Sequence, residues 1–125
     1  MLKKVLLLSV LPLLLAGCTA TFTNLTPRQQ VRNANALYPV EVAFNSRQQS
    51  LRWDSIHPQI LVGTELYPMH PTLLISNRWE GLVPVPAGVN AVKYRYKFDF
   101  EQNEFGPPSQ NSASSQNYVL RILEP

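Results

Sequence analysis

Few residues in this chain of 125 amino acids combine a reactive side chain with the spacing that chemistry requires. Cys18 is the only cysteine, and His57 and His70 are the only histidines. A metal site built from both histidines with Asp54 or Glu65 would need ligands spaced as on one helix or strand face, and no such pair occurs. The sequence therefore predicts neither a metal site nor a bound cofactor.

Motifs of other catalytic classes are missing from the sequence as well. The chain has neither the Gly-x-Ser-x-Gly nor the Ser-x-x-Lys pattern of serine enzymes, and its glycines are scattered singly instead of forming a phosphate-binding loop. The acidic pairs Asp99 with Glu101, and Glu101 with Glu104, could resemble glycosidase carboxylates, but their places on a strand face and a loop favour solubilising charge. We predict a protein without enzymatic activity and without catalytic residues.

A basic stripe is the other charged feature of the sequence. Lys93, Arg95 and Lys97 alternate along one predicted strand, and near a membrane each charge could contribute about 1 kcal/mol of attraction to anionic headgroups or wall polymers. The same residues can instead keep a sheet face wet and pair across strands with acidic neighbours such as Asp99. The second interpretation is favoured, and the stripe is not taken as a site.

The N-terminal segment has the pattern of an export signal. A cationic start at Lys3 and Lys4 precedes an apolar run from Val5 to Leu15. As a helix of about 11 residues this run would cover only ~16 Å, whereas a bilayer core needs about 20 residues. A permanent transmembrane helix is therefore the weaker interpretation. The run ends in Leu15-Ala16-Gly17-Cys18, which resembles the lipobox of bacterial lipoproteins.

The lipobox resemblance implies that residues 1–17 are a signal peptide, that cleavage falls before Cys18, and that the Cys18 sulfur receives a diacylglyceryl group. The alternative is an ordinary secretory signal that happens to adjoin a cysteine. Acylation would account for a lone thiol in an exported chain, and two or three acyl chains would hold the protein at a membrane. Thr19 replaces the aspartate of inner-membrane lipoproteins, which favours the outer membrane.

Composition limits the partners of the remaining chain. Once Lys3 and Lys4 leave with the signal, nine basic residues face eight acidic ones, and no run of like charge remains. A nucleic-acid partner is therefore excluded from our expectations. Residues 18–36 are mostly polar and are predicted to form a lipidated tether, with a first strand over residues 20–25. Asn24-Leu25-Thr26 matches a glycosylation sequon, which is expected to be a coincidence in a bacterial protein.

Residues 37–125 are predicted to form one β domain. Apolar and polar residues alternate with the period of a half-buried strand in Tyr38–Phe44, Ile56–Val62, Arg78–Val85, Ala91–Glu101 and Tyr118–Leu123. A short edge strand is expected over Glu65–Met69, followed by an apolar patch at residues 73–75. The polar segment Gln102–Asn117 has no periodic signal and is predicted to be a mobile loop.

Short strands separated by turns about every ten residues are typical of a sandwich. We therefore predict an all-β fold, a two-sheet antiparallel immunoglobulin/fibronectin-like sandwich of about seven strands, with a small barrel as the alternative. Trp53 and Trp79 are expected to meet the aromatic face of the strand at residues 91–101 in the core.

The sequence after the signal peptide indicates a class of protein but no mechanism. The sequence segments at residues 38–44, 79–86 and 94–100 resemble segments of small uncharacterised bacterial lipoproteins with a β-rich domain. The leading hypothesis is a lipid-anchored envelope module that binds another envelope protein or supports an assembly. The alternative is a module that binds glycans or peptidoglycan fragments by stacking exposed aromatic rings, with Trp53, Trp79 and Tyr67 as candidates.

Overall fold

The computed structural model describes residues 20–47, 50–103 and 105–125, and their secondary structure consists of strands. In chain order the strands are β1 (Ala20–Asn24), β2 (Gln29–Val31), β3 (Leu37–Ser46), β4 (Leu51–Val62), β5 (Glu65–Pro68), β6 (His70–Pro71), β7 (Arg78–Pro84), β8 (Ala91–Gln102), β9 (Ser109–Ser114) and β10 (Tyr118–Leu123). These ranges contain no helix with the length and apolar character needed to cross a membrane. The predicted signal peptide, Cys18 and Glu104 lie outside the described residues.

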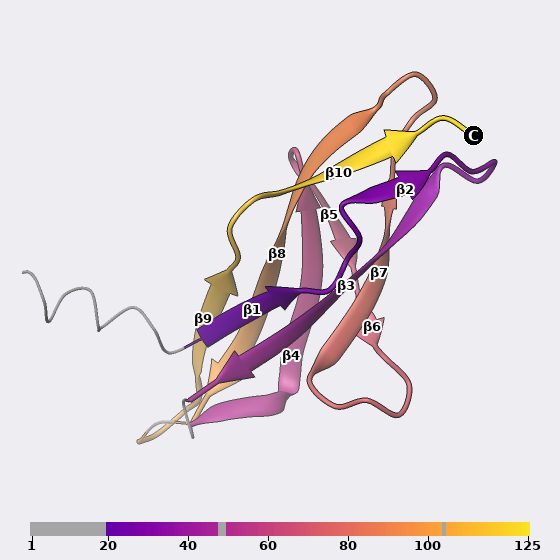
Figure 1. Cartoon of the computed structure of the whole chain (residues 1–125). Coiled ribbons are helices and arrows are strands. Elements are labelled where there is room, and N and C mark those ends of the chain that lie inside the picture. The colour runs from indigo at the N-terminus through magenta and orange to yellow at the C-terminus, as the bar shows by residue number, and fades with distance from the viewer. Residues whose placement is uncertain (1–19, 48–49, 104) are drawn as a thin grey trace, which may run out of the picture.

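The strands form two sheets that pack against each other (Figure 1). One sheet has the order β1-β3-β7-β6, and the other has the order β2-β10-β8-β4-β5. These orders match the A-B-E-D and G-F-C sheets of an immunoglobulin domain, with β5 added beside β4 as in variable-type domains. The sheets do not close into a barrel, so the predicted two-sheet sandwich is confirmed.

The sandwich differs from the prediction in its strand number and at its N-terminal side. It has ten strands instead of about seven, and β2 pairs with β10 in parallel. Residues 18–36 were expected to be a tether with a first strand over residues 20–25, and β1 confirms that strand. The rest of the expectation is wrong, because β1 pairs with β3 in one sheet and β2 pairs with β10 in the other. The sandwich therefore begins at Ala20, well before residue 37. The three-residue strand β2 is too short to show an alternation in the sequence.

The prediction of a mobile loop over Gln102–Asn117 is wrong for part of its length. Strand β9 lies within it and pairs antiparallel with residues 97–102 of β8. Most side chains of β9 are exposed and polar, so no hydrophobic period marks this strand. Its place is determined by backbone hydrogen bonds to the neighbouring strand, which any residue except proline can make.

The core lies between the two sheets and confirms the alternation read in β3, β7 and β8. Its completely buried side chains come from both sheets, and the largest are Tyr38, Tyr96, Phe44, Phe98 and Ile60. Gly81 allows β7 to pack closely against the opposite sheet. A Cβ atom at this position would lie 2.9 Å from Cδ1 of Ile60 and 3.2 Å from the carbonyl oxygen of Pro68.

The two tryptophans do not both enter the core. Trp79 is only 8 % exposed, and its ring contacts that of Phe98 edge-on at 5.2 Å between centroids. Trp53 was expected beside it but is 42 % exposed, with its ring 6.0 Å from that of Phe44 at the margin of the core. The cause is a register shift in β4 between Arg52 and residue 57, because an irregularity of this kind turns the following side chains to the other face.

Candidate functional site

The histidines that the sequence offered for metal binding lie apart. His57 is exposed on β4 and faces Asp99 of β8 in the same sheet. His70 is exposed on β6 in the other sheet, with Nε2 3.7 Å from Oε1 of Glu80. Across the residues that the structure describes, no three His, Cys, Asp or Glu side chains gather as metal ligands would. Cys18, the predicted lipidation site, lies outside these residues.

The carboxylates considered for glycosidase chemistry take part in surface ion pairs. Oε2 of Glu101 accepts a hydrogen bond of 3.1 Å from Nη1 of Arg52, and Oδ1 of Asp99 accepts one of 2.9 Å from Nζ of Lys97. Lys97 was expected to find an acidic partner across strands, but its partner lies two positions further along the same strand. Both pairs are partly exposed, as is typical of charges that keep a sheet face wet.

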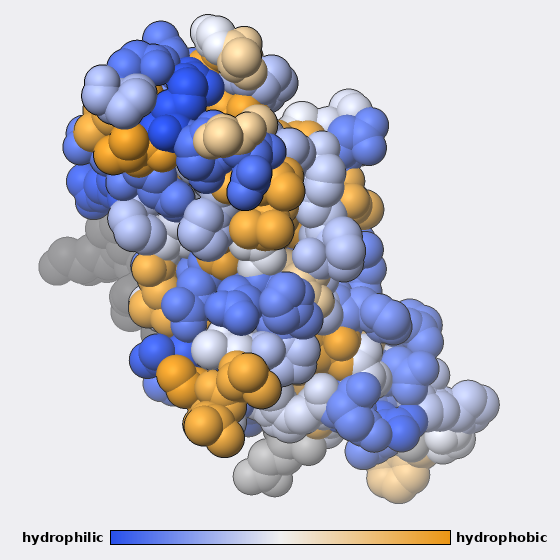
Figure 2. Space-filling model, turned by 90° about the vertical axis from the view of Figure 1, so that its right-hand side faces the viewer, coloured by the Kyte–Doolittle hydropathy of each residue, from blue (hydrophilic) through white to orange (hydrophobic). Residues whose placement is uncertain are grey.

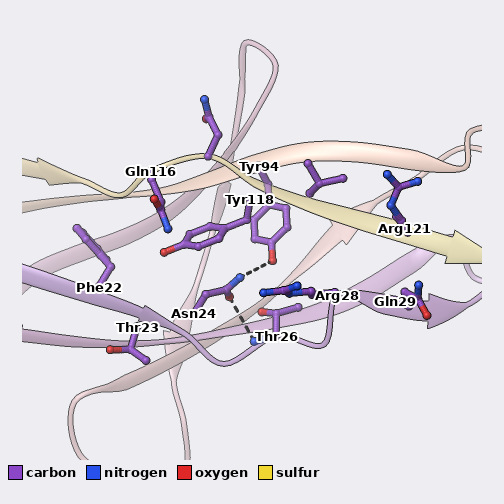
Figure 3. Close-up of a pocket in the computed structure, with 12 residues that line it drawn as sticks. Phe22, Thr23, Asn24, Thr26, Arg28, Gln29, Tyr94, Gln116, Tyr118 and Arg121 are labelled. Atoms are coloured by element: carbon purple, nitrogen blue, oxygen red, sulfur yellow. Dashed lines mark hydrogen bonds between the residues drawn. The ribbon is translucent and has the colours of Figure 1, made fainter.

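A groove that the sequence did not reveal opens at one edge of the sandwich (Figure 3). Its volume is about 750 Å³. One wall is formed by β1 and the segment that leads to β2, where the chain passes from one sheet to the other. The opposite wall is formed by residues 116–121, together with Tyr94 of β8.

The topology of the second sheet explains why the groove is there. Strand β10 pairs with residues 91–94 of β8, whereas β9 pairs with residues 97–102 of the same strand. Both lie beside β8 on the side away from β4, and residues 115–117 connect them outside either strand. Ser115 still bonds to the backbone of Tyr96, with its N–H 2.9 Å from the carbonyl oxygen and its Oγ 2.9 Å from the N–H. The edge of the sheet is therefore interrupted opposite the point at which β1 crosses over.

A network of hydrogen bonds ties β1 to the floor of this groove. Nδ2 of Asn24 donates to Oη of Tyr94 at 2.9 Å, and Oη of Tyr96 donates to Oδ1 of Asn24 at 2.7 Å. The same Oδ1 accepts the backbone N–H of Thr26 at 3.3 Å, which closes a local turn of the Asx type. Oγ1 of Thr26 in turn accepts the backbone N–H of Glu41 at 2.9 Å. The residues that resembled a sequon are thus a structural joint between the sheets.

Tyr96 stays neutral within this network. Burial raises the pKa of Tyr96 well above the ordinary value of 10.0, because a phenolate would lose its hydration there. The hydrogen bond with Thr26 acts in the opposite direction and is the smaller effect. The neutral hydroxyl is a fixed donor beneath the groove.

Aromatic and amide side chains line the groove above this floor. The rings of Tyr94 and Tyr118 lie 5.8 Å apart between centroids and are tilted by 37°. In Figure 3, Tyr118 lies between Gln116 and Tyr94, with Phe22 further along the same side. Tyr118 is half-buried and Gln116 is exposed. The groove therefore offers the half-buried rings of Tyr118 and Phe22 beside hydrogen-bonding amide groups.

Two arginines give the groove a positive charge. The backbone N–H of Arg121 donates to the carbonyl oxygen of Arg28 at 3.0 Å, so the two residues are anchored to each other through the backbone. Both side chains are exposed, and within the described ranges neither guanidinium has an ion pair or a hydrogen bond. No aspartate or glutamate is among the lining residues. Guanidinium groups left free in this way suit a carboxylate or another planar anion.

The sequence contained little signal for this site. Its residues come from the predicted tether, from the inward face of one strand and from the start of another, and only the crossing of β1 brings them together. The one usable hint was Asn24 and Thr26 spaced as in an Asx turn directly after an apolar alternation. Comparison of the chain with known protein families, with curated proteins and with solved structures finds no match.

Proposed function

We propose that this protein is a lipid-anchored module of the bacterial cell envelope that binds an envelope protein through the groove and catalyses no reaction. The observation that carries the binding role is the pair of free guanidinium groups, Arg28 and Arg121, in a groove lined by no carboxylate. The anchor rests on the lipobox-like residues 15–18. Thr19 after the cysteine favours the outer membrane.

The form of the groove supports a protein partner with an acidic, extended segment. Within the described part of the chain, β1 lines the groove and pairs with β3 alone, so no strand is paired with its other edge. An extended segment can add to such an edge through main-chain hydrogen bonds. An acidic side chain of the segment would then meet Arg28 and Arg121, and Gln116 could bond to the main chain of the partner.

The groups that line the groove support binding without catalysis. None of the lining residues is histidine, cysteine, aspartate or glutamate, which are the usual general acids, bases and nucleophiles. Tyr96 beneath the groove has a raised pKa, so it stays a neutral phenol near neutral pH and supplies no phenolate that could act as a base. Arginine is always charged and acts by holding an anion in place.

Two measurements test this proposal. Mass spectrometry of the mature N-terminal peptide should detect acyl groups on Cys18, and Cys18→Ser should release the chain from the membrane fraction. A photo-crosslinking residue at Gln116 should capture one envelope protein in living cells. The same residue at Leu82, which is 48 % exposed on β7, is the matched control and should capture none.

Charge reversal makes the second measurement specific. Arg28→Glu with Arg121→Glu should abolish the crosslink from position 116, while Arg47→Glu, an exposed arginine outside the groove, should preserve it. Equal capture from positions 116 and 82, or capture that survives the double reversal, would contradict the proposed binding surface.

A second candidate function is the binding of an acidic glycan. It is favoured by the half-buried ring of Tyr118 beside amide and guanidinium groups, because sugars are bound by stacking and by planar hydrogen-bonding groups. Trp79 is buried and cannot stack on a ligand from solvent. Peptidoglycan fragments should then shift the NMR signals of groove residues, and Tyr118→Ala should remove the shifts. Shifts confined to Trp53 or Tyr67, away from the groove, would contradict this role.

A further inference from the structure

The most exposed apolar side chains of the described chain lie at one end of the sandwich. Leu73 and Leu74, in the loop between β6 and β7, are 85 % and 103 % exposed, and Phe105, between β8 and β9, is 108 % exposed. No other large apolar side chain in the described residues exceeds the 58 % of Val31. Exposed groups of this kind mark surfaces that contact a partner or a membrane.

Strand pairing places these residues at the end where β1 begins. Ala20 of β1 lies opposite Ser46, the last residue of β3. The loop that holds Leu74 returns to the same end, because the carbonyl oxygen of Asn77 accepts a 3.0 Å hydrogen bond from the backbone N–H of Phe44. Strand β8 ends opposite the first residue of β4, so the chain enters β9 at this end too.

The figures show the same arrangement. In Figure 1 the start of β1, the loop between β6 and β7 and the connection from β8 to β9 all lie toward the lower side of the molecule, whereas the C terminus lies at the top. Figure 2 gives the view from the side, and hydrophobic side chains protrude at its lower end as well. The three apolar positions therefore share one end.

The position of Cys18 in the sequence indicates which partner would cover this end of the sandwich. A single residue, Thr19, separates Cys18 from Ala20. Two residues of extended chain span at most ~7 Å, so acyl groups on Cys18 would lie directly beside the first residue of β1. The bilayer that holds them must then adjoin the end that carries Leu74 and Phe105.

We infer that Leu73, Leu74 and Phe105 insert into the interfacial region of this bilayer, so that the sandwich stands on the membrane at its loops as well as at its anchor. This inference rests on the proposed lipid anchor. Apolar side chains at loop tips gain by entering the interface, as the apolar faces of interfacial helices do. Trp53, half-exposed near the start of β4, is a residue type enriched at membrane interfaces.

This orientation bears on access to the groove. The loops that face the membrane occupy one end, and the turn between β7 and β8 lies with the C terminus at the other (Figure 1). Val89 belongs to this turn, where its N–H bonds to the carbonyl oxygen of Pro86. The groove opens on the long edge between them, where β1 crosses over. A domain held upright at two loops would keep that edge turned toward the neighbouring envelope space, whereas a flexible tether would not.

Depth measurements on the acylated full-length protein test the inference. Acylation occupies Cys18, so a single new cysteine at Leu74→Cys or Phe105→Cys can carry an environment-sensitive fluorophore in vesicles of phosphatidylethanolamine and phosphatidylglycerol. Val89→Cys, an exposed apolar position at the opposite end, is the matched control. Insertion should shift the emission of the probes at 74 and 105 to the blue, because their surroundings become less polar. Spin-labelled lipids should quench the same two probes. Neither effect is expected for the probe at 89.

The outcomes separate this inference from the proposed anchor. Acylated protein whose three probes are quenched equally weakly overturns the inference and leaves the anchor standing, whereas a mature chain without acyl groups overturns both. If the probes at 74 and 105 are shielded from water but are not quenched by the lipids, a protein covers this end of the sandwich. That result also overturns the inference.

A label-free variant adds a second readout. Brominated lipids should quench the fluorescence of Trp53 in the acylated protein that carries no substitution and no label. Leu74→Asp with Phe105→Asp changes fully exposed positions and leaves the core unchanged, so its circular dichroism should match that of the wild type while the quenching is lost. Quenching that persists in this variant contradicts insertion of the loops.

Discussion

Tyr96 in the centre of one sheet donates a 2.7 Å hydrogen bond to the side chain of Asn24 at the end of the edge strand β1 in the other sheet. The two residues are 72 positions apart in the sequence. Asn24 satisfies a second buried tyrosine, Tyr94, with its amide nitrogen at 2.9 Å. One side chain therefore joins the two sheets and forms the floor of the groove.

Asn24→Ala should lower the free energy of unfolding by about 1–3 kcal/mol, because it removes the shortest hydrogen bond of the Tyr96 hydroxyl in a buried place. The hydroxyl then keeps only its 3.2 Å contacts with the carbonyl oxygen of Glu41 and with Oγ1 of Thr26. Urea denaturation measures the difference. Asn45→Ala, at an exposed position of β3, is the control and should change the free energy by less than about 0.5 kcal/mol. Equal effects of the two substitutions would show that the hydrogen bonds of Asn24 contribute nothing to the free energy of unfolding.

The raised pKa of Tyr96 predicts a loss of stability in alkali. Below pH 10.0, the ordinary pKa of tyrosine, the phenol is neutral in both the folded and the unfolded chain, and stability does not depend on its titration. Above that value the unfolded chain loses the proton while the folded protein keeps it, so stability falls by up to about 1.4 kcal/mol per pH unit.

Denaturation at a series of alkaline pH values checks this slope. Tyr96→Phe is less stable at neutral pH because it loses the hydrogen bond, but its stability should depend less steeply on pH above 10.0. An identical slope in the variant and the wild type would be inconsistent with a buried, neutral Tyr96.

Gly81→Ala should destabilise the sandwich by about 1–3 kcal/mol through overpacking. The new methyl group would meet Cδ1 of Ile60 at 2.9 Å and the carbonyl oxygen of Pro68 at 3.2 Å. Ile60→Val removes the nearer contact. In a double-mutant cycle measured by thermal unfolding, Gly81→Ala should therefore cost less in the Ile60→Val background. Strict additivity would mean that the strain comes from the Pro68 carbonyl or from Cγ of Met69, 3.3 Å away, and not from Ile60.

The two tryptophans should respond differently to a soluble quencher. Trp53 is 42 % exposed and Trp79 is 8 % exposed, so acrylamide should reach only the first in the folded protein. Trp53→Phe should remove most of the quenchable fluorescence and Trp79→Phe little of it. Comparable loss in the two variants would contradict the register shift that turns Trp53 outward.

The alternation of apolar and polar residues predicted β3, β7, β8 and β10 and the inward faces of β3, β7 and β8. It worked best in β8, where Tyr94, Tyr96, Phe98 and Phe100 all face the core. Each of these strands has one face in the core and one nearer to water, so burial imposes a period of two on the sequence. A strand without a face in the core shows no such period. Strand β9, whose side chains are mostly polar and exposed, was therefore expected to be a loop.

Trp53 shows a different limit. Its position two residues after the buried Leu51 predicts an inward side chain, and the prediction is wrong because β4 shifts register before residue 57. A register shift depends on pairing with β8, a strand that lies far along the chain. Local spacing does not contain that information.

The sequence by itself determined the fold class, most strand positions and the apolar faces, because these follow from local periodicity and from solvent exclusion. It also carries the lipobox-like residues 15–18, on which the proposed anchor rests. Only the tertiary structure decided that Asn24 meets Tyr96, that Arg28 lies beside Arg121, and that Leu74 and Phe105 share one end with the start of β1. The reason is that β-sandwich contacts join residues distant in sequence, and their partners are fixed by strand order and register.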